Sequence, residues 1–282
     1  MKNSEGFIFG TVGIPKSTPK NPGGTLGGIN RIHELSLSAL ELGWVRSVRV
    51  SEEICAQIKS SGVQNCVKLS VHAPYYINLN ASAEEWPKSR KRLMDAAYYG
   101  FLAGATDVIF HPGSYFNDNP PQVLERAINR LSDCVTELKS MKIDILLRPE
   151  TMGKKALIGS LEDLLHLSSQ IDTVEPCLDF AHLHARTGDG TMNSYNEWIE
   201  LIDQYRFHLG EKSLQNLHIH ISGIEYSVRG EKKHLELAES DFRFVDLLQS
   251  LKDKKCGGRI LCESPVLEED AIKLMAIWEK LN

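Results

Sequence analysis

The sequence predicts a single (β/α)8 barrel that spans residues 1–282 as one domain. Short apolar runs rich in Val and Ile alternate with longer amphipathic stretches, a pattern typical of parallel strands linked by helical crossovers. The chain has eight such pairs, and chemically active side chains end many of the expected strands rather than two. Both features favour a closed TIM barrel over a doubly wound open sheet. A length of 282 residues also suits a barrel of about 250 residues without a second domain.

Each element is expected where the apolar pattern places it. The expected strands cover residues 7–13, 44–50, 67–73, 107–111, 143–148, 174–180, 214–222 and 259–263. The expected helices cover residues 26–42, 52–60, 83–103, 121–141, 161–170, 195–207, 242–251 and 268–281. The segment 224–240 carries the charged run Arg229-Gly-Glu-Lys-Lys-His234. It is expected to be an irregular loop after the seventh strand, on the active-site side of the barrel.

Composition and charge exclude some classes of protein. The net charge of −5 argues against a protein that coats nucleic acid non-specifically, although a local basic rim could still attract phosphate. No run of ~18 apolar residues is present and the first residues lack an apolar signal segment, so we expect a cytoplasmic protein that spans no membrane. The six cysteines are scattered without CxxC spacing, which indicates reduced thiols rather than a zinc ribbon.

Potential metal ligands stand at the ends of six successive expected strands. They are His72, His111, Glu150, Asp179 with His182, His218 or His220, and Glu263. In a barrel these positions converge on one cavity, and carboxylate and imidazole groups are ligands that zinc, manganese and iron accept. A lone histidine at a strand end is usually structural. Six coincidences on one face make that interpretation weak, so the sequence predicts a metal centre. His218 and His220 share a strand face, and spacing alone lets either one reach the metal.

Four segments of the sequence resemble the endonuclease IV family of apurinic/apyrimidinic DNA endonucleases, within the xylose-isomerase-like barrels and in the style of its archaeal-type branch. They are Ser70-Val-His-Ala-Pro-Tyr-Tyr-Ile-Asn-Leu79, His111-Pro-Gly113, Leu178-Asp-Phe-Ala-His182 and Gly230-Glu-Lys-Lys-His-Leu235. The resemblance runs from Phe9-Gly-Thr to Cys262-Glu-Ser-Pro. It implies hydrolysis of the phosphodiester 5′ to abasic sites in duplex DNA during base excision repair, with bound zinc as cofactor.

The resemblance also implies a role for each ligand. His72 and His111 correspond to ligands of a first metal, and Glu150 to the carboxylate that bridges the first and second metals and positions the nucleophile. The other ligands of the second metal correspond to Asp179, His220 and Glu263. His220 is preferred to His218 because His220-Ile-Ser-Gly aligns better with the family's His-Leu-Asn-Asp. The two histidines of a third metal correspond to His182 and His234.

One position departs from the family pattern. An aspartate that would complete the third metal site is replaced by Lys232. Either Glu231 reaches in through a shifted loop, or the third ion is weak or absent. We therefore expect two or three Zn2+ per chain, and Mn2+ or Fe2+ would suit the same ligands.

Other residues are candidates for contact with DNA. Tyr75 matches a family tyrosine that helps to hold distorted DNA. Arg49, Arg229 and Lys232 lie near expected strand ends and could hold the phosphate backbone, and Lys232 could also steady the leaving oxygen. We expect a monomer that acts on duplex DNA. Two alternatives remain: a metal-dependent sugar isomerase or epimerase on the same barrel, and a catalytically silent barrel that binds DNA or a partner.

Overall fold

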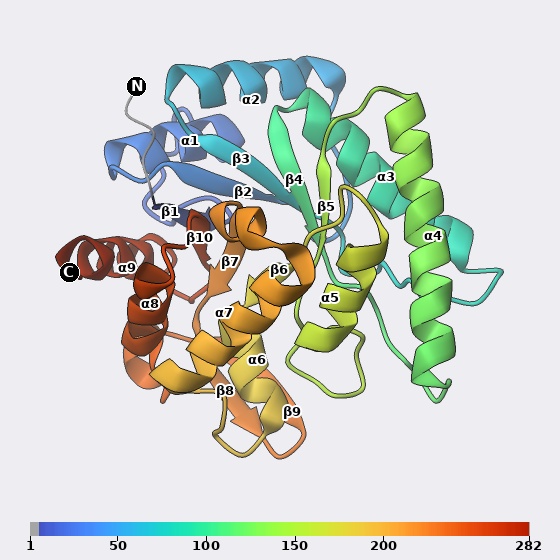
Figure 1. The fold of residues 1–282 in the computed structure, drawn as a ribbon. Helices are drawn as coiled ribbons and strands as arrows, with labels where there is room; N and C mark the ends of the chain where they lie inside the picture. Colours follow the sequence, from blue (N-terminus) through green and yellow to red (C-terminus); the bar gives the residue numbers. More distant parts are fainter. Residues whose placement is uncertain (1–5, 282) are drawn as a thin grey trace.

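A barrel of eight parallel strands forms the centre of the computed structural model, which describes residues 6–281 (Figure 1). Its strands are β1 (Phe7–Val12), β2 (Ala39–Gly43), β3 (Lys68–His72), β4 (Ala105–Phe110), β5 (Leu146–Pro149), β6 (Cys177–Asp179), β7 (Leu217–Ile221) and β10 (Gly258–Cys262). The order of hydrogen-bonded neighbours is β5-β4-β3-β2-β1-β10-β7-β6. Isolated parallel bridges between Leu147 and Val174 and between Glu150 and Cys177 join β5 to β6. These bridges nearly close the barrel, so the predicted fold class is confirmed.

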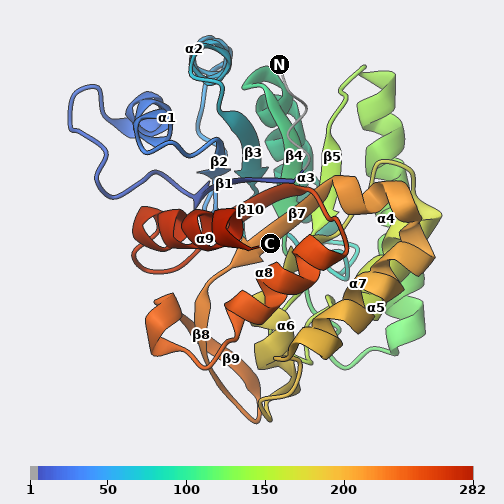
Figure 2. The same ribbon diagram turned by 60° about the vertical axis from the view of Figure 1, so that its left-hand side comes forward.

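Helices cover the outside of the strands (Figures 1 and 2). They are α1 (Gly24–Glu34), α2 (Glu52–Gln64), α3 (Trp86–Leu102), α4 (Pro120–Ser140), α5 (Leu161–Gln170), α6 (Phe180–Thr187), α7 (Tyr195–Leu209), α8 (Phe244–Asp253) and α9 (Glu268–Lys280). Capping boxes begin two of them, because Ser160 and Ser194 exchange hydrogen bonds with Asp163 and Glu197. None of the helices within residues 6–281 is long and apolar enough to cross a membrane.

The second β/α unit differs from the prediction. The expected helix 26–42 ends at Glu34, Ser36 adopts a positive φ of 60°, and β2 then covers Ala39–Gly43. The expected strand 44–50 is instead a loop at the C-terminal end of the barrel, where the Trp44 amide donates to the His72 carbonyl at 3.0 Å. The prediction failed for two reasons. The segment 39–42 consists of Ala, Leu and Glu, which favour helix, and a charged residue such as Glu41 inside a strand is unusual.

The segment 224–240 is more ordered than expected. β8 (Gly223–Ser227) and β9 (Gly230–Leu235) form an antiparallel hairpin, followed by a short 3-10 turn at Leu237–Glu239. The hairpin lies beside α6 (Figure 1), where Ile224 is buried with Ala181 and Ala185. This apolar contact, together with the ladder of hydrogen bonds, holds the hairpin over the C-terminal end of the strands.

A buried ion-pair network occupies the opposite, N-terminal end of the barrel. Arg148 of β5 is fully buried, pairs with Asp107 of β4, and donates to the Asn216 carbonyl just before β7. Arg259 of β10 also reaches Asp107, at 2.9 Å. The network links four strands. It therefore stabilises the barrel that positions the side chains at its C-terminal end.

Candidate metal centre

Glu150, directly after β5, lies at the centre of the predicted ligands. Its Oε2 is 3.3 Å from His72 Nε2 and 3.2 Å from His111 Nε2. Its Oε1 is 3.2 Å from His220 Nδ1 and 3.6 Å from His182 Nδ1. The carboxylate is completely buried. Each oxygen therefore faces a different group of imidazoles, which is the geometry of a carboxylate that can bridge two ions.

A second group surrounds the other side of Glu150. His220 of β7 has its Nδ1 3.3 Å from Glu263 Oε1, and candidate ligand atoms of Glu150, Asp179, His220 and Glu263 all lie within 4.8 Å of one another. Asp179 ends β6 and caps α6, since its Oδ1 accepts from the His182 amide at 2.6 Å. The cap fixes the Asp179 carboxylate and leaves its Oδ2 free to face Glu150, His220 and Glu263.

A third group lies under the hairpin. His182 Nε2 and His234 Nε2 are 3.2 Å apart, and Glu231 Oε2 is 3.6 Å from His182 Nε2. A register shift in the hairpin pairs Glu225 with Lys233 and Tyr226 with Glu231, so Lys232 is an extra residue in β9. The bulge turns Glu231 inward while Lys232, half exposed, pairs with Glu225 at 3.1 Å. Of the two alternatives for the third group, the geometry matches the one in which Glu231 reaches in.

The outer nitrogens of three histidines contact backbone carbonyls. His72 Nδ1 lies 3.0 Å from the Ala73 carbonyl, His182 Nδ1 2.9 Å from that of Thr151, and His234 Nδ1 3.3 Å from that of Glu263. A carbonyl can only accept, so each Nδ1 carries the proton. When these rings are neutral, as metal-binding histidines must be, the lone pair of each Nε2 then points into the cluster.

The charges and spacing of these groups fit divalent cations. Burial raises the pKa of Asp179 to about 6, whereas Glu150 overcomes the effect of burial and raises the pKa of His72 to about 9. The oxygens Glu150 Oε2 and Asp179 Oδ2 are buried without a hydrogen-bond partner among the described residues. The separations of 3.2–3.3 Å around Glu150 Oε2 match the spacing of about 3.3 Å between ligand atoms of a tetrahedral ion with bonds near 2.0 Å.

The candidate metal centre opens into a cavity of about 210 Å³, and a second hollow of about 410 Å³ adjoins it. Tyr75, His111 and Met152 line both. Tyr75 is 51% exposed and stacks on His111, with ring centroids 5.0 Å apart. Phe116 lines the adjoining hollow and is 62% exposed. Large exposed aromatic faces beside a charged cavity are suited to stacking with planar groups.

Comparison with known proteins places the chain in a family. The model of the xylose isomerase-like TIM barrel family matches residues 29–281. The chain belongs to this family. An uncharacterized protein of Methanocaldococcus jannaschii is 35% identical over 98% of both chains. A protein of Thermoplasma volcanium named probable endonuclease 4 is 27% identical and covers 68% of this chain and 69% of its own length.

Solved structures of this barrel family share the fold. Endonuclease IV from Thermus thermophilus matches with a TM-score of 0.71 and 20% identity, over 96% of this chain and 99% of its own. A D-tagatose 3-epimerase-like protein matches equally well, with a TM-score of 0.71, 19% identity, and coverage of 97% and 96%. Structural likeness at this identity supports the barrel alone. The expected membership of the xylose-isomerase-like barrels is confirmed, and the archaeal-type branch stays a prediction.

Other candidates lie outside the metal cavity of this xylose isomerase-like barrel. Arg49 is exposed on the loop after β2, and Arg229 is exposed at the tip of the hairpin. Neither is among the residues that line the cavity in the described part of the chain. His218 contacts Glu41, with its Nε2 2.9 Å from Glu41 Oε2. The contacts of His220 match the resemblance, which prefers it to His218.

Glu41 is a residue of the site that the sequence analysis missed. It lies in the middle of β2, is fully buried, and accepts from Ser70 Oγ at 2.9 Å. Burial alone would raise its pKa, but the charge of His220 and hydrogen bonds from His218 and His220 hold that pKa far below the ordinary value. A signal was available: the short, mostly apolar run Leu37-Ser-Ala-Leu-Glu-Leu42 also fits a strand buried on both faces, which would make Glu41 a buried carboxylate.

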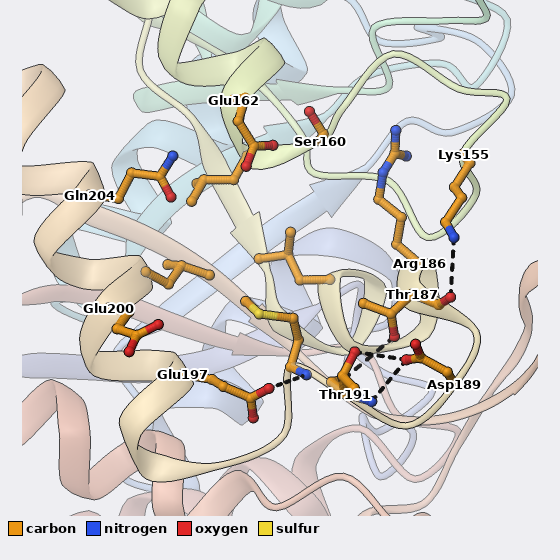
Figure 3. A pocket seen from close by; sticks show the side chains of 14 residues that line it. Lys155, Ser160, Glu162, Arg186, Thr187, Asp189, Thr191, Glu197, Glu200 and Gln204 are labelled. Atoms are coloured by element: carbon orange, nitrogen blue, oxygen red, sulfur yellow. Dashed lines mark hydrogen bonds between the residues drawn. The ribbon is translucent and has the colours of Figure 1, made fainter.

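A cavity of about 450 Å³ between α5, α6 and α7 has a different character (Figure 3). Several of its charged groups have structural partners. Glu197 accepts from the Met192 amide at 2.9 Å, Asp189 accepts from Thr191 Oγ1 at 2.7 Å, and Lys155 donates to the Thr187 carbonyl at 3.3 Å (Figure 3). These side chains hold the end of α6 and the start of α7, so their role is structural.

Proposed function

We propose that this protein is a metal-dependent endonuclease that hydrolyses the phosphodiester 5′ to abasic sites in duplex DNA. The observation that supports it is the position of Glu150, whose Oε2 faces His72 and His111 while Oε1 faces His220. A phosphodiester crowds negative oxygens into one cavity, and several cations compensate that charge better than one. Three adjoining ligand groups around one cavity suit such a substrate.

The ligand groups would share the ions as follows. His72, His111 and Glu150 would hold the first, Glu150, Asp179, His220 and Glu263 the second, and His182, His234 and Glu231 the third. Bound Zn2+, or Mn2+ or Fe2+ in its place, would polarise the phosphoryl oxygens and lower the pKa of a water molecule. The buried Glu150 carboxylate faces imidazoles on both of its oxygens and would also position the attacking water.

Recognition of the lesion would depend on the mouth of the cavity. A sugar without a base costs less to extrude from the duplex than an intact nucleotide, for which the cost is a few kcal/mol. A cavity of about 210 Å³ suits a sugar phosphate better than a whole nucleotide. Tyr75 and Phe116 offer aromatic faces to the neighbouring bases, and Arg229 offers a cation to the backbone.

A metal-dependent sugar epimerase is the second candidate. The group Glu150, Asp179, His220 and Glu263 could by itself hold one ion, and a D-tagatose 3-epimerase-like protein has a barrel of the same TM-score. One ion is enough to polarise a carbonyl of a neutral sugar. His72, His111, His182 and His234 would then have no chemical task, which makes this candidate the weaker one.

The decisive experiment incubates the metal-loaded protein with a labelled duplex that carries one abasic site, with the matched intact duplex, and with a panel of ketoses. We expect one cut 5′ to the lesion, leaving a 3′ hydroxyl, and no cut in the intact duplex. Glu150→Gln is the control and should lose cleavage while it keeps its fold. Ketose interconversion without DNA cleavage would refute the proposal in favour of the epimerase. DNA binding that Glu150→Gln leaves intact, without cleavage by either protein, would indicate a silent binding module.

A further inference from the structure

His220 differs from its neighbouring histidines in what holds its outer nitrogen. Backbone carbonyls hold the outer nitrogens of His72, His182 and His234. His220 Nε2 instead lies 3.4 Å from Oε2 and 3.3 Å from Oε1 of Glu41. Both side chains are completely buried. The outer nitrogen of His220 therefore faces a carboxylate, whereas the nearest partner of each of the other three is a backbone carbonyl at 2.9–3.3 Å.

We propose that Glu41 is a positioning residue that holds His220 with its proton on Nε2 and its Nδ1 lone pair toward the second ion. The proposal rests on the metal centre of the proposed function. A carboxylate can only accept when ionised, so a neutral His220 beside it carries its proton on Nε2. The free Nδ1 then faces Glu150 and Glu263 at 3.2 and 3.3 Å. A carboxylate on the outer nitrogen also makes the inner nitrogen a stronger donor to a metal.

Glu41 is itself held in place by two other strands. Its Oε2 accepts from Ser70 Oγ of β3 at 2.9 Å and lies 2.9 Å from His218 Nε2 of β7. An ionised carboxylate can only accept a hydrogen bond, so the His218 ring donates to Glu41 from Nε2. His218 thus anchors Glu41, which explains why two histidines stand two residues apart on one strand face.

The distances separate this arrangement from a further metal site. Candidate ligand atoms of Cys177, His218 and His220 lie within 4.8 Å of one another, and so do those of Glu41, His72 and Glu263. The contact of 2.9 Å between Glu41 and His218 has the length of a hydrogen bond. Ligand atoms around a tetrahedral zinc ion are about 3.3 Å apart. The Glu41–His218 pair is therefore joined by a hydrogen bond, with no ion between the two atoms.

The test compares metal binding by the wild type, Glu41→Gln and Ser70→Ala, each stripped of metal and titrated with Zn2+ against a chromophoric chelator. Glu41→Gln keeps the shape and removes the charge, and we expect one ion to bind roughly 10- to 100-fold more weakly with the number of ions unchanged. Ser70→Ala removes one support of Glu41 without touching His220, and should keep the affinity of every ion within about threefold.

Thermal unfolding with and without metal distinguishes positioning from a structural role. The metal-free forms of the wild type and Glu41→Gln should melt close together, and the Zn2+-induced rise in melting temperature should be smaller in the variant. Histidine 15N spectra of the zinc form should show His220 protonated on Nε2. Equal affinities in Glu41→Gln and wild type would overturn the inference. So would a metal-free variant that has already lost its fold.

Three further outcomes bear on this inference, and the last of them separates it from the proposed function. If Glu41→Gln binds one ion fewer than the wild type, Glu41 is itself a ligand and the positioning role is overturned. A wild type that binds no divalent ion would also overturn it. If the wild type binds ions but does not cut abasic DNA, the proposed endonuclease activity is refuted. Weaker metal binding by Glu41→Gln would in that case still support the positioning role of Glu41.

Discussion

Glu231 Oε2 lies 3.6 Å from His182 Nε2, on the side of the hairpin that also carries His234. The chain around it is closely packed. The Glu231 amide donates to the Gly153 carbonyl at 2.9 Å, and a Cβ at Gly153 would lie only 2.6 Å from the Glu231 Cβ. A glycine is therefore required at 153 for Glu231 to take this place.

The first prediction concerns the third ion. Glu231→Gln should weaken binding of one ion, because it removes the only acidic side chain that reaches His182 from the hairpin within the described residues. Lys232→Gln is the matched control: its side chain is half exposed and pairs with Glu225, so metal binding should not change. Metal content by elemental analysis after dialysis measures both. If Lys232→Gln loses the ion and Glu231→Gln keeps it, Glu231 is not the residue of the bulge that binds the third ion.

The strand-end ligands were predictable from the sequence because the fold alone brings them together. Once the alternating pattern indicated a barrel, His72, His111, Asp179 and Glu263 had to converge, since the C-terminal ends of its strands meet around one mouth. The mistake in β2 had a cost at the site: a segment predicted as helix offered no reason to place Glu41 inside the barrel.

The third ligand group needed information that the sequence pattern does not contain. Lys232 stands where the resemblance to endonuclease IV leads us to expect an aspartate, and a β-bulge brings Glu231 toward His182 instead. A bulge depends on how β8 and β9 pair and on the close approach of β9 to Gly153. Such tertiary contacts leave no periodic signature, so the prediction correctly stopped at two alternatives.

The second prediction concerns the aromatic mouth. Tyr75→Ala should lower affinity for duplex DNA with an abasic site by about 1–3 kcal/mol, because an exposed ring that can stack with a base is removed. Tyr75→Phe keeps the ring and should bind nearly as well. Fluorescence anisotropy with a catalytically inactive background measures the affinities. Phe207→Ala, which removes a ring that is 84% exposed on α7, should leave binding unchanged; equal losses in both alanine variants would contradict the role of Tyr75.

The third prediction concerns salt. Despite the net charge of −5, affinity for abasic duplex should fall steeply as salt rises, because cations on the protein replace counterions on the phosphates. Arg229→Gln should reduce the slope of log affinity against log salt by about one if this side chain contacts one phosphate. Arg206→Gln, on α7 in an ion pair with Asp203, should leave the slope unchanged. A flat salt dependence in the wild type would contradict backbone contact.

The fourth prediction concerns removal of metal. Stripping divalent ions should lower the free energy of unfolding, because buried carboxylates such as Glu150 and Asp179 lose the cations that compensate their charge. Zn2+ added back at 100 times its dissociation constant should raise the free energy of unfolding by about 2.7 kcal/mol for each site that exists only in the folded chain. Chemical denaturation with and without chelator measures the difference. Identical denaturation curves with and without chelator would mean that the ions bind the folded chain no better than the unfolded chain.

The last prediction concerns the ion pairs at the N-terminal end of the barrel and is independent of metal. Burial alone would raise the pKa of Asp107, but Arg148 and Arg259 hold it far below the ordinary value. A depressed pKa in the folded chain means that the unfolded chain binds the proton more readily. The stabilisation is therefore complete above the unfolded pKa of about 3.9 and is lost as pH falls below it.

Asp107→Asn should therefore lower the free energy of unfolding by about 3–5 kcal/mol at pH 7, because Arg148 loses a buried partner. The gap between variant and wild type should narrow as pH falls from about 4 toward 2, because the unfolded wild type takes up a proton at Asp107 there and the folded wild type does not. Asp203→Asn, whose contacts with Lys254 and Arg206 are partly exposed, should cost about 1 kcal/mol or less. Urea denaturation across this pH range measures all three proteins. A gap for Asp107→Asn that stays constant with pH would show that the loss comes from packing rather than from charge.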